Sequence, residues 1–197
     1  MKRKIKQLTI ILNDKVDYFC TYSITIMSKR DLKKYVSELK KSELEDQIIE
    51  LYDKFKEVKT YYNFVFNPNE TNLLKDAKLK ISNEYFPIRG KRPKMRRSVA
   101  QKFIKHFILL GVDSFIIADV MLYSIEIAQS LSSEKEIKQE AFYKSMINSF
   151  EQAVSFMIEK GILYEFKSRV VAIQSESEAQ KWPNFYEFNA VVERFNY

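Results

Sequence analysis

The sequence predicts an α+β fold that is mainly helical, and three observations lead to that prediction. Only 3 of the 197 residues are glycine and 4 are proline, whereas β-rich folds use many more of both in their turns. Apolar residues recur at helical spacing through much of the chain. Segments rich in β-branched and aromatic residues, which are typical of strands, lie near both ends. We therefore expect a helical chain with a β-hairpin at each end.

The first part of the chain predicts an antiparallel β-hairpin. Residues 4–13 and 16–27 are rich in Ile, Thr, Tyr and Phe, and polar residues lie between them. The first apolar run is short and interrupted, so we interpret it as a strand and not as a signal peptide. Cys20 is the single cysteine, which excludes a disulfide within the chain and a cysteine zinc site. This cysteine usage fits a reducing compartment, and we expect an intracellular, cytoplasmic protein.

A long helix is predicted after this hairpin. Ser28 and Asp31 form an N-cap pattern, and apolar residues then recur at helical spacing as far as Tyr62. A second cap pattern, Ser42 with Glu45, predicts a break or restart within that helix. The Lys and Glu residues on the other face are the solvated surface of an amphipathic helix.

A boundary between two subdomains is predicted near residue 90. Pro87, Gly90 and Pro93 make this the densest cluster of helix-breaking residues in the chain, and the segment before it fits a helix with a strand or an irregular connection. We therefore expect three parts: residues 1–88 as a hairpin and helix, residues 89–97 as a basic connector, and residues 98–197 as a helical subdomain.

The second half predicts three helices and a closing hairpin. The N-cap patterns are Ser98 with Gln101, Asp113 alone, and Ser133 with Glu136, while Gly111 and Gly161 fit helix ends. The apolar stretch from Phe115 to Leu131 is shorter than a typical membrane span and predicts a buried core helix. Residues 162–174 and 184–192 have the composition of two strands joined by a loop.

Residues 133–166 with the following hairpin resemble the winged helix-turn-helix family, and the resemblance extends over residues 98–192. It implies a recognition helix from Ser145 to Lys160, which ends at Gly161, and a two-stranded wing over residues 162–192. The wing tip carries Glu176 and Glu178, where a DNA-binding wing is usually basic. This difference favours protein contacts for the wing.

Positive charge is concentrated in the first half of the chain. Residues 1–105 contain 25 Lys and Arg against 13 Asp and Glu, whereas residues 106–197 contain 8 against 13. No acidic residue occurs from Tyr85 to Val112. The basic residues of this acid-free run are our candidate nucleic-acid ligands: Arg89, Lys91, Arg92, Lys94, Arg96, Arg97, Lys102 and Lys105. They suit phosphate contacts, and two other interpretations remain open: pairing with acidic protein groups, and a passive linker.

The chain offers little support for catalysis. His106 is the only histidine, and no glycine-rich phosphate loop is present. Asp119 and Glu126 are seven residues apart, so both fall on one face of the apolar helix. They could bind a divalent cation, but an exposed helix edge or pairing with a basic neighbour explains them more simply. We expect no metal, no cofactor and no enzymatic activity.

Two functions follow from these observations. The first is a nucleic-acid-binding module for regulation, replication or nucleoprotein assembly, which would contact the phosphate backbone through the basic connector. The alternative is a structural or adaptor subunit of a larger assembly, in which the same charges bind an acidic protein; a viral or mobile-element origin would fit this role. A homo-oligomer fits either function, and a membrane partner is not expected. Six aromatic residues between Trp182 and Tyr197 predict a buried closing strand or an anchor for a partner.

Overall fold

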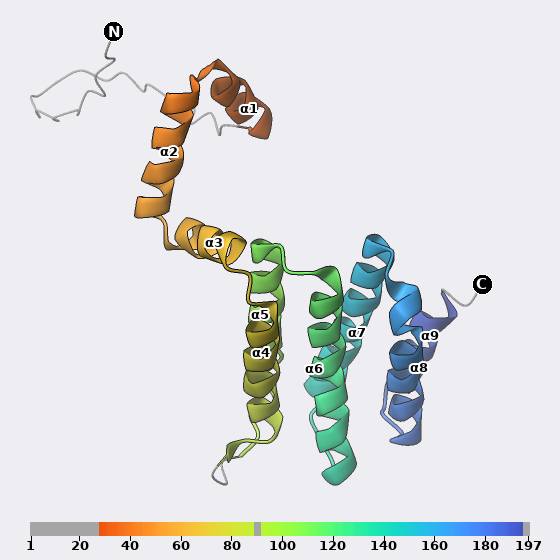
Figure 1. The fold of residues 1–197 in the computed structure, drawn as a ribbon. Helices are drawn as coiled ribbons and strands as arrows, with labels where there is room; N and C mark the ends of the chain where they lie inside the picture. Colours follow the sequence, from red (N-terminus) through yellow and green to blue (C-terminus); the bar gives the residue numbers. More distant parts are fainter. Residues whose placement is uncertain (1–27, 89–91, 195–197) are drawn as a thin grey trace, which may run out of the picture. The chain divides into compact units, whose positions relative to one another are not determined.

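The computed structural model describes residues 28–88 and 92–194, and these residues form nine α-helices with no strand. The α+β prediction is therefore wrong for the described part of the chain. The N-terminal hairpin predicted over residues 4–27 lies outside the described residues. The helices are α1 (Lys29–Glu38), α2 (Lys41–Lys54), α3 (Lys56–Phe66), α4 (Glu70–Tyr85), α5 (Arg97–Leu110), α6 (Ser114–Glu134), α7 (Glu140–Lys160), α8 (Leu163–Ala179) and α9 (Phe185–Glu193) (Figure 1).

The chain divides into two compact units, Met1–Glu50 and Leu51–Tyr197, and the division falls within α2. The boundary predicted at residues 89–97 lies inside the second unit. There α4, which precedes the connector, packs against α5 and α6, which follow it. The segment between α4 and α5 therefore joins neighbouring helices of one unit.

The predicted long helix at residues 28–62 is three shorter helices. The Ser28 cap is confirmed, because its hydroxyl accepts the Asp31 N–H and the Asp31 carboxylate accepts the Ser28 N–H. The chain is extended at Leu39 and again at Phe55, which ends α1 and α2. Glu43, rather than the predicted Ser42 and Glu45 pair, caps α2 by accepting the Lys40 N–H at 2.9 Å. Two breaks thus divide a continuous apolar stripe, with a side-chain cap after the break at Leu39 and none at Phe55.

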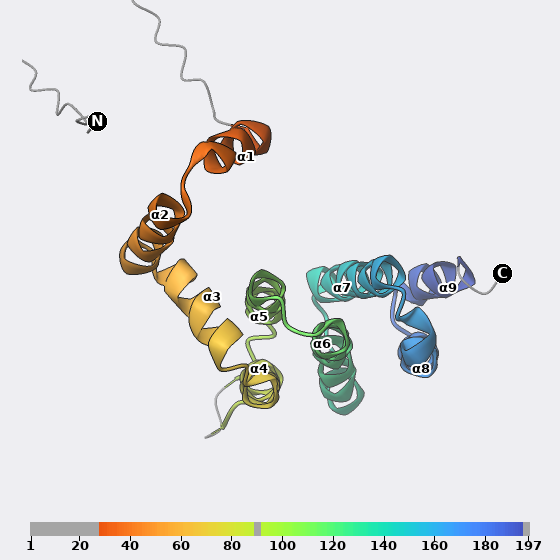
Figure 2. The same ribbon diagram turned by 45° about the horizontal axis from the view of Figure 1, so that its top comes forward.

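Helix α6 forms the centre of the second unit and packs against α4, α5, α7 and α8. Figures 1 and 2 show it between α5 and α8. Asp113 caps it as predicted, since its carboxylate accepts the Phe115 N–H at 2.7 Å. Among the described helices, α6 is the one long and apolar enough to cross a membrane by length and composition, yet 56% of its most apolar window is buried inside the protein. The predicted buried core helix is confirmed.

Two of the three glycines end helices. Gly111 has φ +73° after α5, and Gly161 has φ +70° after α7. Both lie in the left-handed region, where glycine carries no Cβ penalty, so each stops its helix as the sequence predicted. The side chain of Ser98 does not cap α5, because that helix already begins at Arg97. Ser133 lies in the last turn of α6, so it does not begin the next helix either.

The predicted C-terminal hairpin is instead the helix pair α8 and α9, so the wing expected at residues 162–192 is helical. The buried residues of α8 are Phe166, Val170, Ile173 and Ser177, which recur three and four residues apart. That spacing places them on one face of a helix and cannot place them on one face of a strand. Tertiary packing along this face therefore outweighs the β-branched and aromatic composition that suggested strands.

Candidate functional site

The basic connector is held against the end of α4. The backbone N–H groups of Lys94 and Met95 both donate to the Glu84 carbonyl oxygen, at 2.9 and 3.0 Å. Met95 has φ +51°, a left-handed conformation that costs a residue with a Cβ some free energy. The Met95 side chain packs against the hydrophobic core. These contacts fix the backbone of residues 94 and 95 and determine where the neighbouring cations point.

Arg96 is engaged within the protein. Its Nε and Nη2 atoms donate to the two carboxylate oxygens of Glu84 at 2.8 and 2.7 Å, a two-point contact between the connector and α4. The Glu84 side chain is only 12% exposed. Hydrogen bonding from Arg96 lowers the pKa of Glu84 from its ordinary value. Arg96 therefore neutralises a largely buried carboxylate, which was one of the alternatives for the connector charges.

Arg97 links α5 to α7. Its Nε donates to Ser149 Oγ at 2.7 Å, and its Nη2 donates to Gln152 Oε1 at 2.9 Å. Gln101 donates to the same Gln152 oxygen at 3.3 Å. These acceptors are uncharged, and burial lowers the pKa of the Arg97 guanidinium. Arg97 is thus a half-buried positive charge at one end of a groove of about 510 Å³ between α5 and α7.

Four candidate nucleic-acid ligands remain available to a partner. Arg92, Lys94, Lys102 and Lys105 are exposed and form no ion pair with another described residue. Arg89 and Lys91 lie outside the described residues. The structure thus divides the described candidates into two that serve internal contacts and four that face solvent.

Lys80 was missed by the sequence analysis. It lies on α4 with its ammonium 5.6 Å from the Phe103 ring centre on α5, so it extends this basic region.

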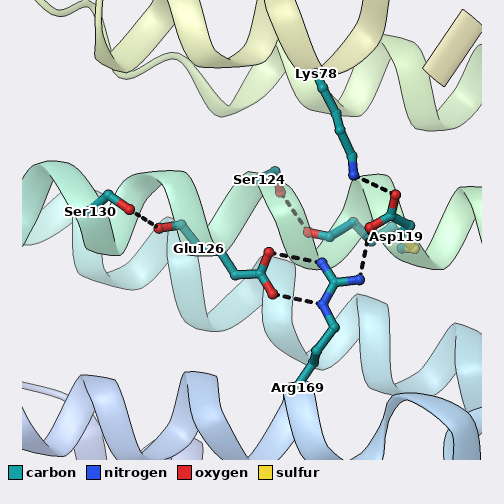
Figure 3. A network of polar contacts seen from close by, with 7 residues as sticks. Lys78, Asp119, Ser124, Glu126, Ser130 and Arg169 are labelled. Carbon is teal, nitrogen blue, oxygen red and sulfur yellow. Dashed lines mark hydrogen bonds and ion pairs between the residues drawn. The ribbon is translucent and has the colours of Figure 1, made fainter. Parts of the chain in front are cut away.

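Asp119 and Glu126 are joined by one arginine that lies between them (Figure 3). Arg169 on α8 donates to both oxygens of Glu126 at 2.8 Å and to Asp119 Oδ1 at 2.8 Å. Lys78 on α4 reaches Asp119 Oδ2 at 2.6 Å. The hydrogen bonds to Glu126, followed by those to Asp119, raise the pKa of Arg169.

This charge network joins three helices and explains both carboxylates. The Arg169 guanidinium occupies the space between them that a shared cation would need. Among the described residues, no group of three His, Cys, Asp or Glu side chains could hold a metal ion. Pairing with a basic neighbour, the simpler interpretation of Asp119 and Glu126, is therefore confirmed. Neither Lys78 nor Arg169 was identified from the sequence, because their partners lie about forty to fifty residues away.

Helices α1, α2 and α3 bury no residue at all. Many of their apolar side chains are instead exposed, by 59% at Ile49 and 76% at Phe66, although α3 packs against α5 and Phe64 contacts the hydrophobic core. A soluble chain seldom leaves so many large apolar side chains in solvent without a partner for them. The sequence showed the apolar stripe but could not show that it stays uncovered. The exposed apolar residues of the three helices are Leu32, Tyr35, Ile48, Ile49, Leu51, Phe55, Tyr61, Val65 and Phe66.

Aromatic rings cluster along α3. Tyr62 lies 5.5 Å from Tyr61 and 6.3 Å from Phe66, measured between ring centres. Lys59 places its ammonium 5.4 Å from the ring centre of Tyr52. Exposed tyrosine and phenylalanine side chains are the residue types that dominate binding energy at protein interfaces. The composition of α3 therefore suits contact with another protein chain.

The C-terminal aromatic residues divide between core and surface. Trp182 and Phe188 are buried, 5.6 Å apart between ring centres, and Trp182 Nε1 donates to Ser132 and Gln180. Tyr186 is exposed, and residues 195–197 lie outside the described part. The predicted burial of the aromatic tail is thus confirmed for Trp182 and Phe188, whereas the predicted strand is wrong because this part is helical.

These features define a described region whose regular structure is all helical, with a folded core, a partly engaged basic connector and three helices that carry exposed apolar side chains. The chain belongs to DUF6155, a family of unknown function, whose model matches residues 27–196. No curated protein and no solved structure matches the chain. The family match begins one residue before the Ser28 cap, so α1, α2 and α3 belong to the part that defines the family.

Proposed function

We propose that this protein is a non-enzymatic subunit of a protein assembly, and that it binds another protein chain through the exposed apolar side chains of α1, α2 and α3. One observation carries the proposal: three consecutive helices of 10, 14 and 11 residues bury no side chain. Isolated helices of this length are marginal in water, because most helical stability in proteins comes from packing of an apolar face. A partner that covers these faces supplies that packing.

Cross-linking of the full-length protein in its source cells, followed by mass spectrometry, tests this proposal. Phe66→Gln and Ile49→Gln remove exposed apolar surface from α3 and α2. Tyr164→Gln is the matched control, because Tyr164 is 87% exposed on α8. We expect a protein cross-linked to wild type and to the control to disappear in the Phe66 and Ile49 variants. Identical cross-links in all four proteins would contradict the proposal.

Nucleic-acid binding is the second candidate, and it is favoured by the four solvent-facing cations Arg92, Lys94, Lys102 and Lys105. Counterion release makes phosphate contacts weaken steeply as salt rises. We expect alanine at all four positions to lower the affinity for DNA and RNA. The slope of log affinity against log salt concentration should also become shallower, by the amount that up to about four phosphate contacts contribute. The matched control replaces four exposed lysines elsewhere with alanine: Lys144, Lys160, Lys167 and Lys181. Equal losses in both variants would indicate a general charge effect and contradict this candidate.

Mass measurement by light scattering, with and without nucleic acid, separates the two candidates. An oligomer that forms from protein alone and ignores nucleic acid favours the assembly subunit. A mass that increases only when DNA or RNA is added favours nucleic-acid binding.

A further inference from the structure

Helices α1 and α2 carry opposite net charges beside their uncovered apolar residues. α1 contains four Lys and Arg against two Asp and Glu, whereas α2 contains two lysines against five acidic residues. Along α1, Tyr35 and Val36 follow Leu32 by three and four residues, and along α2 Ile48 follows Leu44 by four. Each helix therefore presents an apolar stripe; the stripe of α1 lies on a helix of net positive charge and that of α2 on a helix of net negative charge.

The two helices do not bury these stripes against each other within one chain. No residue of either helix is buried. The side-chain contact between them that the structure shows is a hydrogen bond of 2.6 Å from Gln47 Nε2 to Tyr35 Oη. An extended link at Leu39 and Lys40 joins the helices directly. Leu32, Tyr35 and Ile48 therefore remain exposed among the described residues, and a partner from outside the pair can cover them.

We infer that the partner is a second copy of this chain, and that α1 of each copy packs against α2 of the other. In a two-fold arrangement both contacts are equivalent, so a single pairing covers four apolar stripes. The pairing brings a helix of net charge +2 against one of net charge −3. Pairing α1 with α1, or α2 with α2, would place like charges together and is disfavoured. This inference rests on the proposed function and specifies its partner.

A charge-reversal experiment on the full-length chain tests the inference. The first variant carries Lys29→Glu and Lys33→Glu, which makes α1 negative. The second carries Glu45→Lys and Asp46→Lys, which makes α2 positive. In each variant alone, the helices that meet across the two-fold axis have the same sign. In an equal mixture, every α1 meets an α2 of opposite sign. Pairing within a chain would be disrupted in both variants and would not recover on mixing.

Sedimentation equilibrium on fluorescently labelled protein measures the result. We expect wild type to form a dimer, each variant alone to dissociate about tenfold more readily, and the mixture to recover to within about threefold of wild type. Added salt should weaken the wild-type dimer, because the favourable charges are exposed. Circular dichroism checks that each variant keeps its helical content.

Three outcomes would overturn the inference: a wild-type chain that stays monomeric at about 100 μM, a dimer that charge reversal does not weaken, or weakened variants that do not recover on mixing. Failure of the inference and failure of the proposed function remain distinguishable. A monomeric chain whose cross-linked partner is lost in the Phe66 and Ile49 variants contradicts self-association only. A monomeric chain without such a partner contradicts both.

Discussion

Helices α1, α2 and α3 differ from helices α4 to α9 in how their apolar residues are used. The first three bury no residue, whereas each of the other six buries at least three. Both sets show helical apolar spacing, so the sequence pattern alone does not distinguish them. The difference shows that an amphipathic stripe predicts a helix but not whether the same chain covers it.

The largest expected effect is in the core around Trp182. Its ring packs against those of Phe142, Tyr143 and Phe188, and its indole N–H is hydrogen-bonded. Trp182→Ala should lower the free energy of unfolding by about 3–5 kcal/mol, because it removes a buried aromatic side chain and leaves a cavity. Urea denaturation measures the change, with Tyr164→Ala as the exposed control. A loss below about 1 kcal/mol would contradict the assignment of Trp182 to the core.

The next largest effect concerns the charge network on α6. Arg169→Met leaves Asp119 and Glu126 half-buried without the arginine between them, and we expect a loss of about 1–3 kcal/mol. The Arg169 side chain is 33% exposed, so water screens part of the cost. Asp119 keeps its ion pair with Lys78 in this variant, so Glu126 is the carboxylate left unpaired. Adding Glu126→Gln removes that charge and should restore part of the stability. No recovery in this double variant would argue that packing, and not charge, explains the loss.

A smaller effect is expected where glycine ends α7. Gly161 has φ +70°, and no atom lies within 4 Å of the position that an added Cβ would occupy. Gly161→Ala should therefore cost about 1 kcal/mol, from the left-handed backbone alone. Gly111→Ala should cost a similar amount, because Gly111 has the same conformation and equally open surroundings. Unchanged or increased stability in both variants would contradict this explanation.

The contact between Arg96 and Glu84 should make stability depend on pH at the acidic end. Arg96 lowers the pKa of Glu84 below 4.5, so the unfolded chain binds more protons in that range. Stability from this contact is complete above about pH 4.5 and decreases as pH falls through the lowered folded pKa. Denaturation curves recorded between about pH 3 and pH 6 should show that the free energy of unfolding depends less on pH in Arg96→Gln than in wild type. Arg92→Gln is the matched control and should keep the pH dependence of wild type. If it loses as much pH dependence as Arg96→Gln, the assignment is contradicted.

The smallest expected effect is in α2 and α3. Ile49→Ser and Phe66→Ser should each change the free energy of unfolding by less than about 0.5 kcal/mol, because both side chains are mostly exposed.

Amide hydrogen exchange should also be faster in α1 and α3 than in α6, since buried helices open least often. A partner that covers the exposed residues should slow that exchange. Equal protection in α1 and α6 of the isolated chain would remove the contrast between the two sets of helices.

The sequence predicted the local signals that depend on neighbouring residues. The Ser28 and Asp113 caps, the helix ends at Gly111 and Gly161, and the buried core helix α6 were all correct. The caps and the helix ends arise from groups within a few residues of one another, so the chain specifies them locally. The burial of α6 was predicted from its apolar composition, although it depends on packing against α4, α5, α7 and α8. Strand composition failed at α8, where burial along one helical face outweighed β propensity.

The candidate basic site shows the same division. Charge sign and the acid-free run could be read directly, and four of the eight candidates are exposed and form no ion pair with another described residue, as a binding surface requires. The sequence could not show that Arg96 neutralises Glu84 or that Arg97 bonds to Ser149 and Gln152. Arg96 and Glu84 are twelve residues apart, and the Arg97 partners are more than fifty residues away.

The sequence by itself therefore determined where α1 and α6 begin, where α5 and α7 end, where positive charge concentrates and which helix is most apolar. Caps, glycines and charge act over one or two helical turns, so they need no folded core. Only the tertiary structure decided which apolar stripes are covered, which cations are engaged and that Arg169 joins Asp119 to Glu126. Those outcomes depend on contacts between distant segments, because burial and pairing exist only after the helices have packed.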